Sequence, residues 1–343
     1  MKKTFLTLGF SLLVLNFLHA QTPLSHYKIA NRIHVDSNGG WDYITADDES
    51  GKLYVSHGTI VQVVDPNTSK VIGIIPNLHG VHGIAIASKL NKGFITSGKD
   101  TSCYVFNLKT NATLARIKVS GVGPDAIVYD KTTQRIFTMN GKSGNATVID
   151  AKTNAIVGTI PLDGKPEFCV SDGNGKLYVN LEDTNAIEEI DAKEMKVLKH
   201  WFIKPGESPS GLAMDVKKRR LFSVCDNKMM VISDADKGAV IKTVPIGERP
   251  DAAAFDPEKM RAYSSNGDGT ITVVQDSADT YTVLENFRTQ RGARTIAINT
   301  KNHHLYLPVS EMTPLPPVRA GVEKPRPKPK PGTFTVIDVE PID

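Results

Sequence analysis

The chain has few of the residues that cross-link small extracellular folds. Its 343 residues include three cysteines, Cys103, Cys169 and Cys225, which lie more than fifty residues apart. No CxxC pair and no close Cys/His pair occurs, so neither a disulfide framework nor a zinc finger is indicated. We expect the three thiols to be small buried hydrophobic groups, with a reactive thiol as the alternative. Stability must therefore come from a packed core.

The motifs of several common enzyme classes are also missing. The sequence contains no Walker loop and no GxSxG nucleophile elbow, and it has no HExxH pair and no CxxCH haem site. These absences argue against a P-loop NTPase, an α/β-hydrolase, a zincin and a c-type cytochrome. No sustained helical period appears after the first twenty residues, which argues against a helical bundle.

The only long apolar run is at the N-terminus. Lys2 and Lys3 precede an apolar stretch from Phe5 to Phe17, and small and polar residues follow it. This pattern predicts a signal peptide over residues 1–20 and a mature chain that begins near Gln21. The run is shorter than the roughly 20 residues of a transmembrane helix, and no second run follows. We therefore expect a periplasmic or secreted protein without a membrane span.

Charge of one sign is not in excess. Removal of the predicted leader takes away two lysines and leaves 39 Lys and Arg against 37 Asp and Glu. A near-neutral chain lacks the overall electrostatic footprint of a nucleic-acid-binding protein, which leaves only a local patch for such a role.

What the sequence does contain is a repeat of about 42 residues. An aromatic residue recurs within a short apolar run at spacings of 40 to 44 residues. The repeated positions are Tyr54, Phe94, Phe137, Tyr178, Phe222, Tyr263 and Tyr306. Each period holds four β-type runs separated by Asn, Asp and Gly, as in AIVY, RIFTM, ATVID and AIVGTI of the third period. Four strands in such a period predict one blade of a β-propeller.

Seven such units predict an all-β, seven-bladed β-propeller of four-stranded antiparallel blades over residues 24–343. The last unit supplies only three strands and ends in TFTVIDV. The run from Tyr27 to Val35 precedes the first unit and can supply the fourth strand. We expect this N-terminal strand to close the last blade, because closure removes exposed strand edges.

The repeat resembles the YVTN repeat of the YncE-like propeller family. The matching segments include KLYVS at 52–56, TIVQVVDPNTSKVIGIIP at 59–76 and NATVIDAKTNAIVGTIP at 145–161. The resemblance extends over nearly the whole mature chain. It implies a seven-bladed propeller and an extracytoplasmic location, and it implies no particular reaction.

The position in front of each innermost strand is mostly charged or polar. These positions are expected to form a ring at one face of the propeller, because all innermost strands start on that face. We call them the ring positions, and they are Asp42, His82, Asp125, Glu167, Ser210, Asp251 and Arg294.

Two interpretations of the ring acids stay open. Asp125, Glu167 and Asp251 each follow a proline, and an acid at such a place commonly caps a turn. His82 and Arg294 do not fit that pattern and favour a ligand site. Other aspartates are expected to be turn residues on the opposite face: Asp130, Asp172, Asp215 and Asp256.

The ring leads to a first hypothesis and an alternative. The first is a binding module that holds a protein, a peptide or a small anionic or metal-bearing ligand on this face, and we expect it to be a monomer, as propellers commonly are. Its expected ligand-binding residues are Asp42, His82, Asp125, Glu167, Asp251 and Arg294. The alternative is a metal-dependent lactonase or lyase with His82 and Glu167 as catalytic residues. A divalent cation such as calcium would then be held by Asp125, Glu167 and Asp251.

The segment 310–332 is an insert in the last blade. It contains seven prolines and five Lys and Arg residues, so we expect an exposed, extended arm on the face of the ring. It would either attract an acidic partner or serve as a spacer. A weaker hypothesis assigns single-stranded nucleic acid to this arm.

Overall fold

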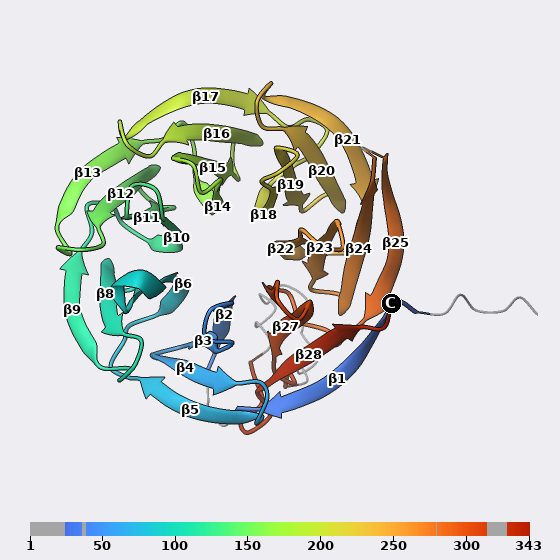
Figure 1. Cartoon of the computed structure of the whole chain (residues 1–343), viewed down its shortest axis with the longest axis horizontal. Helices are drawn as coiled ribbons and strands as arrows, with labels where there is room; N and C mark the ends of the chain where they lie inside the picture. Colours follow the sequence, from blue (N-terminus) through green and yellow to red (C-terminus); the bar gives the residue numbers. More distant parts are fainter. Residues whose placement is uncertain (1–24, 36–38, 279, 314–327) are drawn as a thin grey trace, which may run out of the picture.

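The chain forms seven four-stranded antiparallel sheets around a central axis (Figure 1). The computed structural model describes residues 25–35, 39–278, 280–313 and 328–343. The predicted signal peptide and residues 314–327 of the insert lie outside this range. Within it, no helix is long and apolar enough to cross a membrane. The predicted seven-bladed propeller is confirmed.

Six blades run outward from the axis in chain order. Blade 1 contains β2 (Trp41–Ala46), β3 (Leu53–His57), β4 (Ile60–Asp65) and β5 (Lys70–Ile75). Blade 2 contains β6 (Val81–Ala87), the 3-10 helix η1 (Ser88–Leu90), β7 (Lys92–Ser97), β8 (Ser102–Asn107) and β9 (Thr113–Lys118). Blade 3 contains β10 (Pro124–Asp130), β11 (Arg135–Asn140), β12 (Asn145–Asp150) and β13 (Ile156–Pro161). Blade 4 contains β14 (Pro166–Ser171), β15 (Lys176–Leu181), β16 (Ala186–Asp191) and β17 (Lys196–Phe202). Blade 5 contains β18 (Pro209–Asp215), β19 (Arg220–Cys225), β20 (Met229–Asp234) and β21 (Ala239–Pro245). Blade 6 contains β22 (Pro250–Asp256), β23 (Arg261–Asn266), β24 (Thr270–Ser277) and β25 (Thr280–Arg288).

The N-terminal strand closes the ring, as predicted. Blade 7 contains β26 (Ala297–Asn299), β27 (His304–Val309), β28 (Thr335–Pro341) and, outermost, β1 (Tyr27–His34). β1 pairs antiparallel with β28 from Tyr27 opposite Pro341 to His34 opposite Thr335. The Tyr27 hydroxyl also lies 2.9 Å from that of Tyr263 in blade 6. β1 and β28, which lie far apart in the sequence, therefore belong to one blade, and Tyr27 links that blade to blade 6.

The recurrent aromatic residues pack between the blades. All seven are at most 1% exposed, and Phe222 stacks on Phe255 of the next blade with ring centroids 5.2 Å apart. The three cysteines are buried and unpaired, and burial raises the pKa of the Cys103 and Cys225 thiols to about 12. The interpretation of these residues as packing groups is confirmed.

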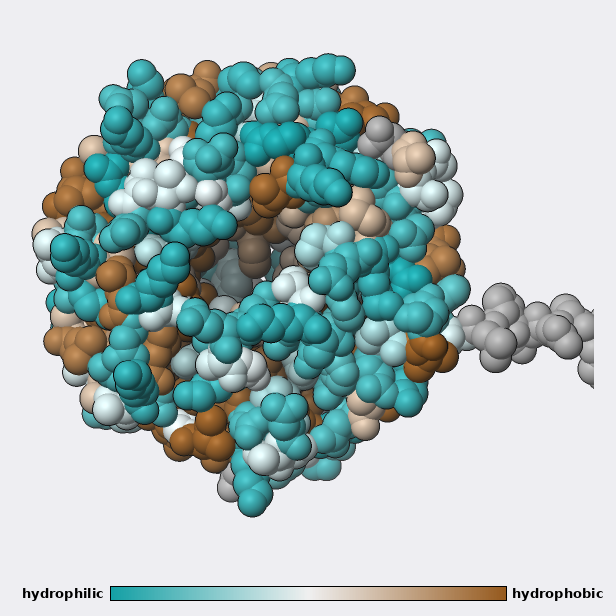
Figure 2. All heavy atoms as spheres, viewed as in Figure 1, coloured by the Kyte–Doolittle hydropathy of each residue, from teal (hydrophilic) through white to brown (hydrophobic). Residues whose placement is uncertain are grey.

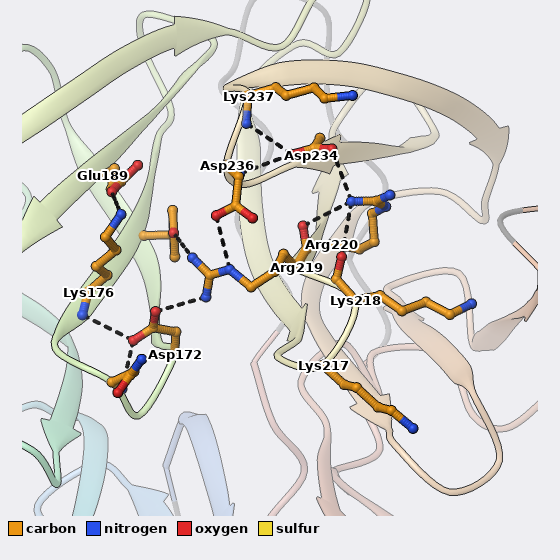
Figure 3. A network of polar contacts seen from close by, with 12 residues as sticks. Asp172, Lys176, Glu189, Lys217, Lys218, Arg219, Arg220, Asp234, Asp236 and Lys237 are labelled. Carbon is orange, nitrogen blue, oxygen red and sulfur yellow. Dashed lines mark hydrogen bonds and ion pairs between the residues drawn. The ribbon is translucent and has the colours of Figure 1, made fainter.

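The turns opposite the ring follow the predicted aspartate pattern. Asp215 and Asp256 each accept hydrogen bonds from the backbone N–H groups two and three residues later. Arg219, in the adjacent basic run over 217–220, also has a structural role (Figure 3). Arg219 donates to Asp172 at 2.8 Å and to the Tyr178 hydroxyl at 2.6 Å, and it contacts Asp236 at 3.1 Å. Arg219 therefore joins blades 4 and 5.

Candidate functional site

A β-bulge at the start of the innermost strand directs the ring side chains. The pairing register shifts between Trp41 and Ile44 in β2 and between Pro124 and Ile127 in β10, and the other four of the first six blades repeat the shift. Residues inside a bulge leave the regular ladder, and bulges often redirect side chains near functional sites. Six ring positions thus lie within a strand and not in front of it, whereas Arg294 precedes β26.

Hydrogen bonds from neighbouring blades fix the ring backbone. Asn180 Nδ2 donates to the carbonyl of Ser210 at 3.0 Å, and Thr295 Oγ1 donates to the carbonyl of Asp42 at 2.7 Å. Two further blade pairs repeat this bond, from Thr96 to Asp125 and from Ser265 to Arg294. Each bond crosses a blade boundary, so the spacing of the ring is tied to the packing of the whole propeller.

The ring side chains converge on one cavity. Figure 2 shows the hollow at the centre of the molecule. A polar cavity of about 170 Å³ lies on the axis. Its lining residues are Asp42, Tyr43, Asp125, Glu167, Phe168, Ser210, Asp251, Ala252, Arg294 and Thr295. Six of the seven ring positions therefore face a shared space.

His82 joins two carboxylates. Its Nδ1 lies 2.6 Å from Asp42 Oδ2 and 3.6 Å from Asp125 Oδ1. These carboxylates raise the pKa of His82 above its usual value despite the opposing effect of burial. One potential ligand atom from each of the three residues lies within 4.8 Å of the others. Two carboxylates and an imidazole at this distance can hold a divalent cation.

Two cations pair with the remaining acids. Arg294 contacts Asp251 through Nη1 and lies 3.5 Å from Asp42 Oδ1 through Nη2. Lys165 lies 2.7 Å from Glu167 Oε1 and also contacts Glu182. Lys165 is thus shared by two acids.

Burial and mutual repulsion disfavour the ionised ring acids. Removal from water is the largest effect and raises the pKa of Asp125 and of Asp251 to about 6. The nearby Asp42 adds to both shifts. Burial also raises the pKa of Glu167 to about 7, against the opposing effect of Lys165. These carboxylates are held together at a cost in stability, which is common at functional sites.

An aromatic pair forms the floor of the polar cavity. Tyr43 of β2 and Phe168 of β14 come from opposite sides of the ring (Figure 1), and their centroids lie 5.3 Å apart. Burial raises the pKa of Tyr43 well above its usual value, and the four ring carboxylates add to this effect. A second cavity of about 360 Å³ shares both rings and is lined by Ile44, Ile84 and Ile127 among others. The axis therefore changes from polar to apolar at the aromatic pair.

The structure brings six of the predicted ring residues to one cavity, but the contacts among the ring side chains differ from the predicted ones. The side-chain contacts of Asp125, Glu167 and Asp251 within the described chain include ring residues, Lys165 and Tyr43, which favours the ligand-site interpretation over turn capping. The predicted metal trio of these acids does not form a cluster. Glu167 pairs with Lys165 and Asp251 with Arg294, so Asp125 joins Asp42 and His82 instead.

Sequence reasoning missed Tyr43, Phe168 and Lys165. The residue after the ring position is Gly, Ala or Thr in the other five blades, and Tyr43 and Phe168 depart from this pattern. At Gly83 an added Cβ would lie 2.9 Å from the carbonyl oxygen of Asp125, which explains the small residue there. The aromatic exceptions could have been noticed. The contact of Lys165 with two acids depends on loop geometry that no local pattern shows.

By fold and by this axial site, the chain is a seven-bladed β-propeller with a polar central funnel. No family model matches it. Antigen Lp49 of Leptospira interrogans is 23% identical over 219 residues, which are 60% of this chain and 48% of that protein. The YncE protein of Escherichia coli O157:H7 is 25% identical over 171 residues, with 45% and 48% of the two chains covered. The YncE protein of Salmonella typhi is 24% identical over 169 residues, with 49% and 43% covered.

The aligned region spans about half the length of each of these relatives. Together with the seven blades, they support the resemblance to YncE-like propellers. Solved structures show the fold alone. The structure of U3-55K has a TM-score of 0.74 at 10% identity and covers 90% of this chain and 97% of that one. A chain of the mitotic checkpoint complex has a TM-score of 0.70 at 12% identity, with 88% and 96% covered.

Proposed function

We propose that the chain is an extracytoplasmic binding protein that holds a small cationic ligand in its central funnel. The observation that carries this proposal is the convergence of four carboxylates on one cavity of about 170 Å³. This volume suits a hydrated divalent cation or a short aliphatic amine and excludes a folded partner from the cavity itself.

The sequence of the ring positions was compatible with an anionic ligand as well as a cation. The balance of charges in the structure favours a cation. Five acids meet three basic groups near the axis, since Glu182 shares Lys165 with Glu167. A bound cation would offset the repulsion that raises the pKa of Asp125 and Asp251. Binding would therefore release protons near pH 6. An anion would increase the cost of the ionised carboxylates.

The aromatic floor supports the same ligand class. Tyr43 and Phe168 both line the polar cavity, and a cation that sheds part of its water and lies over an aromatic ring gains roughly 0.5–2 kcal/mol. The apolar cavity beyond the pair would accommodate the hydrocarbon part of an organic amine. A hydrated metal ion would use only the polar side.

Calorimetric titration with putrescine and with CaCl₂ tests the proposal. We expect one of these probes to bind the mature protein. The same probe should bind the Asp125→Asn and Asp251→Asn variants at least tenfold more weakly. Glu248→Gln is the matched control, because Glu248 is an exposed acid that pairs with Lys228 away from the cavity. The proposal fails if neither probe binds at millimolar concentration, or if all variants bind equally.

A second candidate is a metal-dependent hydrolase or lyase. It is favoured by the cluster of Asp42, His82 and Asp125 and by Glu167, whose pKa of about 7 suits a general base at neutral pH. In this case Glu167→Gln would abolish lactone turnover and leave calcium binding unchanged. Absence of turnover by the calcium-loaded protein would contradict the enzyme and leave the binding protein intact.

The location and the assembly state belong to the same proposal. The signal peptide over residues 1–20 would be removed on export, and the propeller would act as a monomer. N-terminal sequencing of the exported protein should begin near Gln21, and sedimentation should give one chain per particle. An uncleaved cytoplasmic product, or a stable dimer, would contradict these statements.

A further inference from the structure

Blade 4 carries a cluster of acids and imidazole away from the funnel. It consists of Asp163 in the connection from β13 to β14, Glu188 in β16 and His200 in β17. One potential ligand atom from each lies within 4.8 Å of the others. Glu188 pairs directly with His200 in the antiparallel ladder, which places both side chains on one face of the sheet.

Glu188 is the unusual member of this cluster. Its side chain is fully buried, and Oε1 receives the backbone N–H of Asp163 at 3.2 Å and lies 3.3 Å from His200 Nδ1. Oε2 is buried without a hydrogen-bond partner in the described chain. An unpaired carboxylate oxygen in the interior is costly, so this oxygen indicates a missing partner.

The other blades show that the fold does not need a carboxylate here. The ladder position of Glu188 and His200 is occupied by Thr147 and Thr159 in blade 3. Thr147 Oγ1 receives the backbone N–H of Ser120 at 3.1 Å, the same bond that Glu188 makes with Asp163. The Ser120 hydroxyl lies 2.8 Å from Thr147 Oγ1 and 2.7 Å from Thr159 Oγ1.

Blade 6 repeats the neutral arrangement. Thr272 Oγ1 receives the backbone N–H of Gly247 at 3.1 Å and lies 2.7 Å from Asn286 Oδ1 of the paired strand. A hydroxyl is therefore sufficient to hold the connection between blades. Blade 4 replaces these neutral groups with two carboxylates and a histidine, and the extra acid is not explained by packing.

We propose that Asp163, Glu188 and His200 form a binding site for a divalent transition metal ion of the zinc class. Two carboxylate oxygens and one imidazole nitrogen suit Zn²⁺, and a three-residue site leaves a position for water or a further ligand. A dication balances the two carboxylates beside a neutral imidazole, and it supplies the partner that Glu188 Oε2 lacks. Asp163 and His200 lie at the surface, so the ion has a route of entry.

The site is connected to the funnel through the chain. Asp163 lies two residues before Lys165 and four before Glu167, both of which line or contact the ring. A metal bound to Asp163 would fix this connection to the outer strands of blade 4. The occupied site would thus stabilise the loop that carries Lys165.

The experiment is a Zn²⁺ titration of tag-free, EDTA-treated mature protein that carries His82→Ala. This change removes the imidazole of the funnel cluster, so a failure of the funnel proposal does not affect the result. We expect binding of one Zn²⁺ and a rise in the thermal midpoint. Glu188→Gln and His200→Ala in the same background should each weaken binding at least tenfold.

The controls separate a metal site from a structural pair. His304→Ala removes another surface histidine that contacts a carboxylate, and it should leave Zn²⁺ binding unchanged. Glu188→Gln retains an oxygen for the Asp163 N–H, and His200→Ala changes only a surface side chain, so at least one variant should fold. The proposal is overturned if Zn²⁺ does not bind at micromolar concentration, or if binding is unchanged in a folded Glu188→Gln or His200→Ala protein.

Discussion

Replacement of Asp125 by Asn should stabilise the fold at neutral pH and impair the funnel. The ordinary pKa of Asp is 3.8, and the pKa of Asp125 in the folded chain is about 6. Above pH 6 the Asp125 carboxylate is ionised in both the folded and the unfolded chain. The charge is less stable in the folded chain, where it is partly removed from water. A rise of about two in pKa corresponds to about 3 kcal/mol. Because the Asp125 side chain is 33% exposed, solvent screening reduces our expectation to about 1–2 kcal/mol.

The pH dependence gives the sign of this effect. A folded-state pKa above the unfolded value means that the folded chain binds more protons between pH 6 and pH 3.8. The wild-type chain therefore regains this stability as the pH falls through that range. Asp125→Asn should raise the free energy of unfolding at pH 7.5 and lose its advantage near pH 4.

Urea unfolding followed by tryptophan fluorescence at both pH values measures the effect. The control is Asp150→Asn, because hydrogen bonds from Thr153 and Lys152 lower the pKa of Asp150. A carboxyl group whose pKa is lower in the folded state stabilises the fold at a pH above its unfolded-state pKa. This stabilisation is lost as the pH falls through its folded-state pKa. Asp150→Asn should thus destabilise at pH 7.5. The reasoning is refuted if Asp125→Asn also destabilises at pH 7.5, or if its effect is the same at both pH values.

Three further changes test the fold and the ring. Phe137→Ala empties a fully buried position and should reduce the free energy of unfolding by about 3–5 kcal/mol in urea unfolding; a loss below about 1 kcal/mol would contradict its packing role. Tyr27→Phe removes the hydroxyl that meets Tyr263 and should cost about 1–2 kcal/mol in the same assay, whereas no change would show that this contact does not help to hold the closing strand. Lys165→Met removes the cation beside Glu167, so carboxyl NMR should show the pKa of Glu167 rising above about 7; a fall would contradict the assigned contact.

The blade repeat could be predicted because each blade uses the same local code. The aromatic residues such as Phe137 and the turn acids such as Asp215 act within or next to their own hairpin, so their spacing shows their role. The closing strand could be predicted by counting strands. The last unit supplies three strands instead of four, and the β-type run that begins at Tyr27 precedes the first unit and belongs to no other blade.

The ring could be located from the sequence, but its contacts could not. The bulges that redirect Asp125 and its equivalents depend on the pairing register, and register is a property of two strands. The proximity of Tyr43 to Phe168 depends on where blades 1 and 4 face each other across the axis. The choice between turn capping and a shared cavity therefore required coordinates.

The most direct test of the funnel is a pH titration of its carboxyl groups by ¹³C NMR, with and without putrescine or CaCl₂. In the free protein we expect resonances of Asp125 and Asp251, assigned through Asn variants, to titrate near pH 6. The probe that binds should lower both values. Titration of both groups near pH 4, unchanged by either probe, would contradict a strained carboxylate ring built to receive a cation.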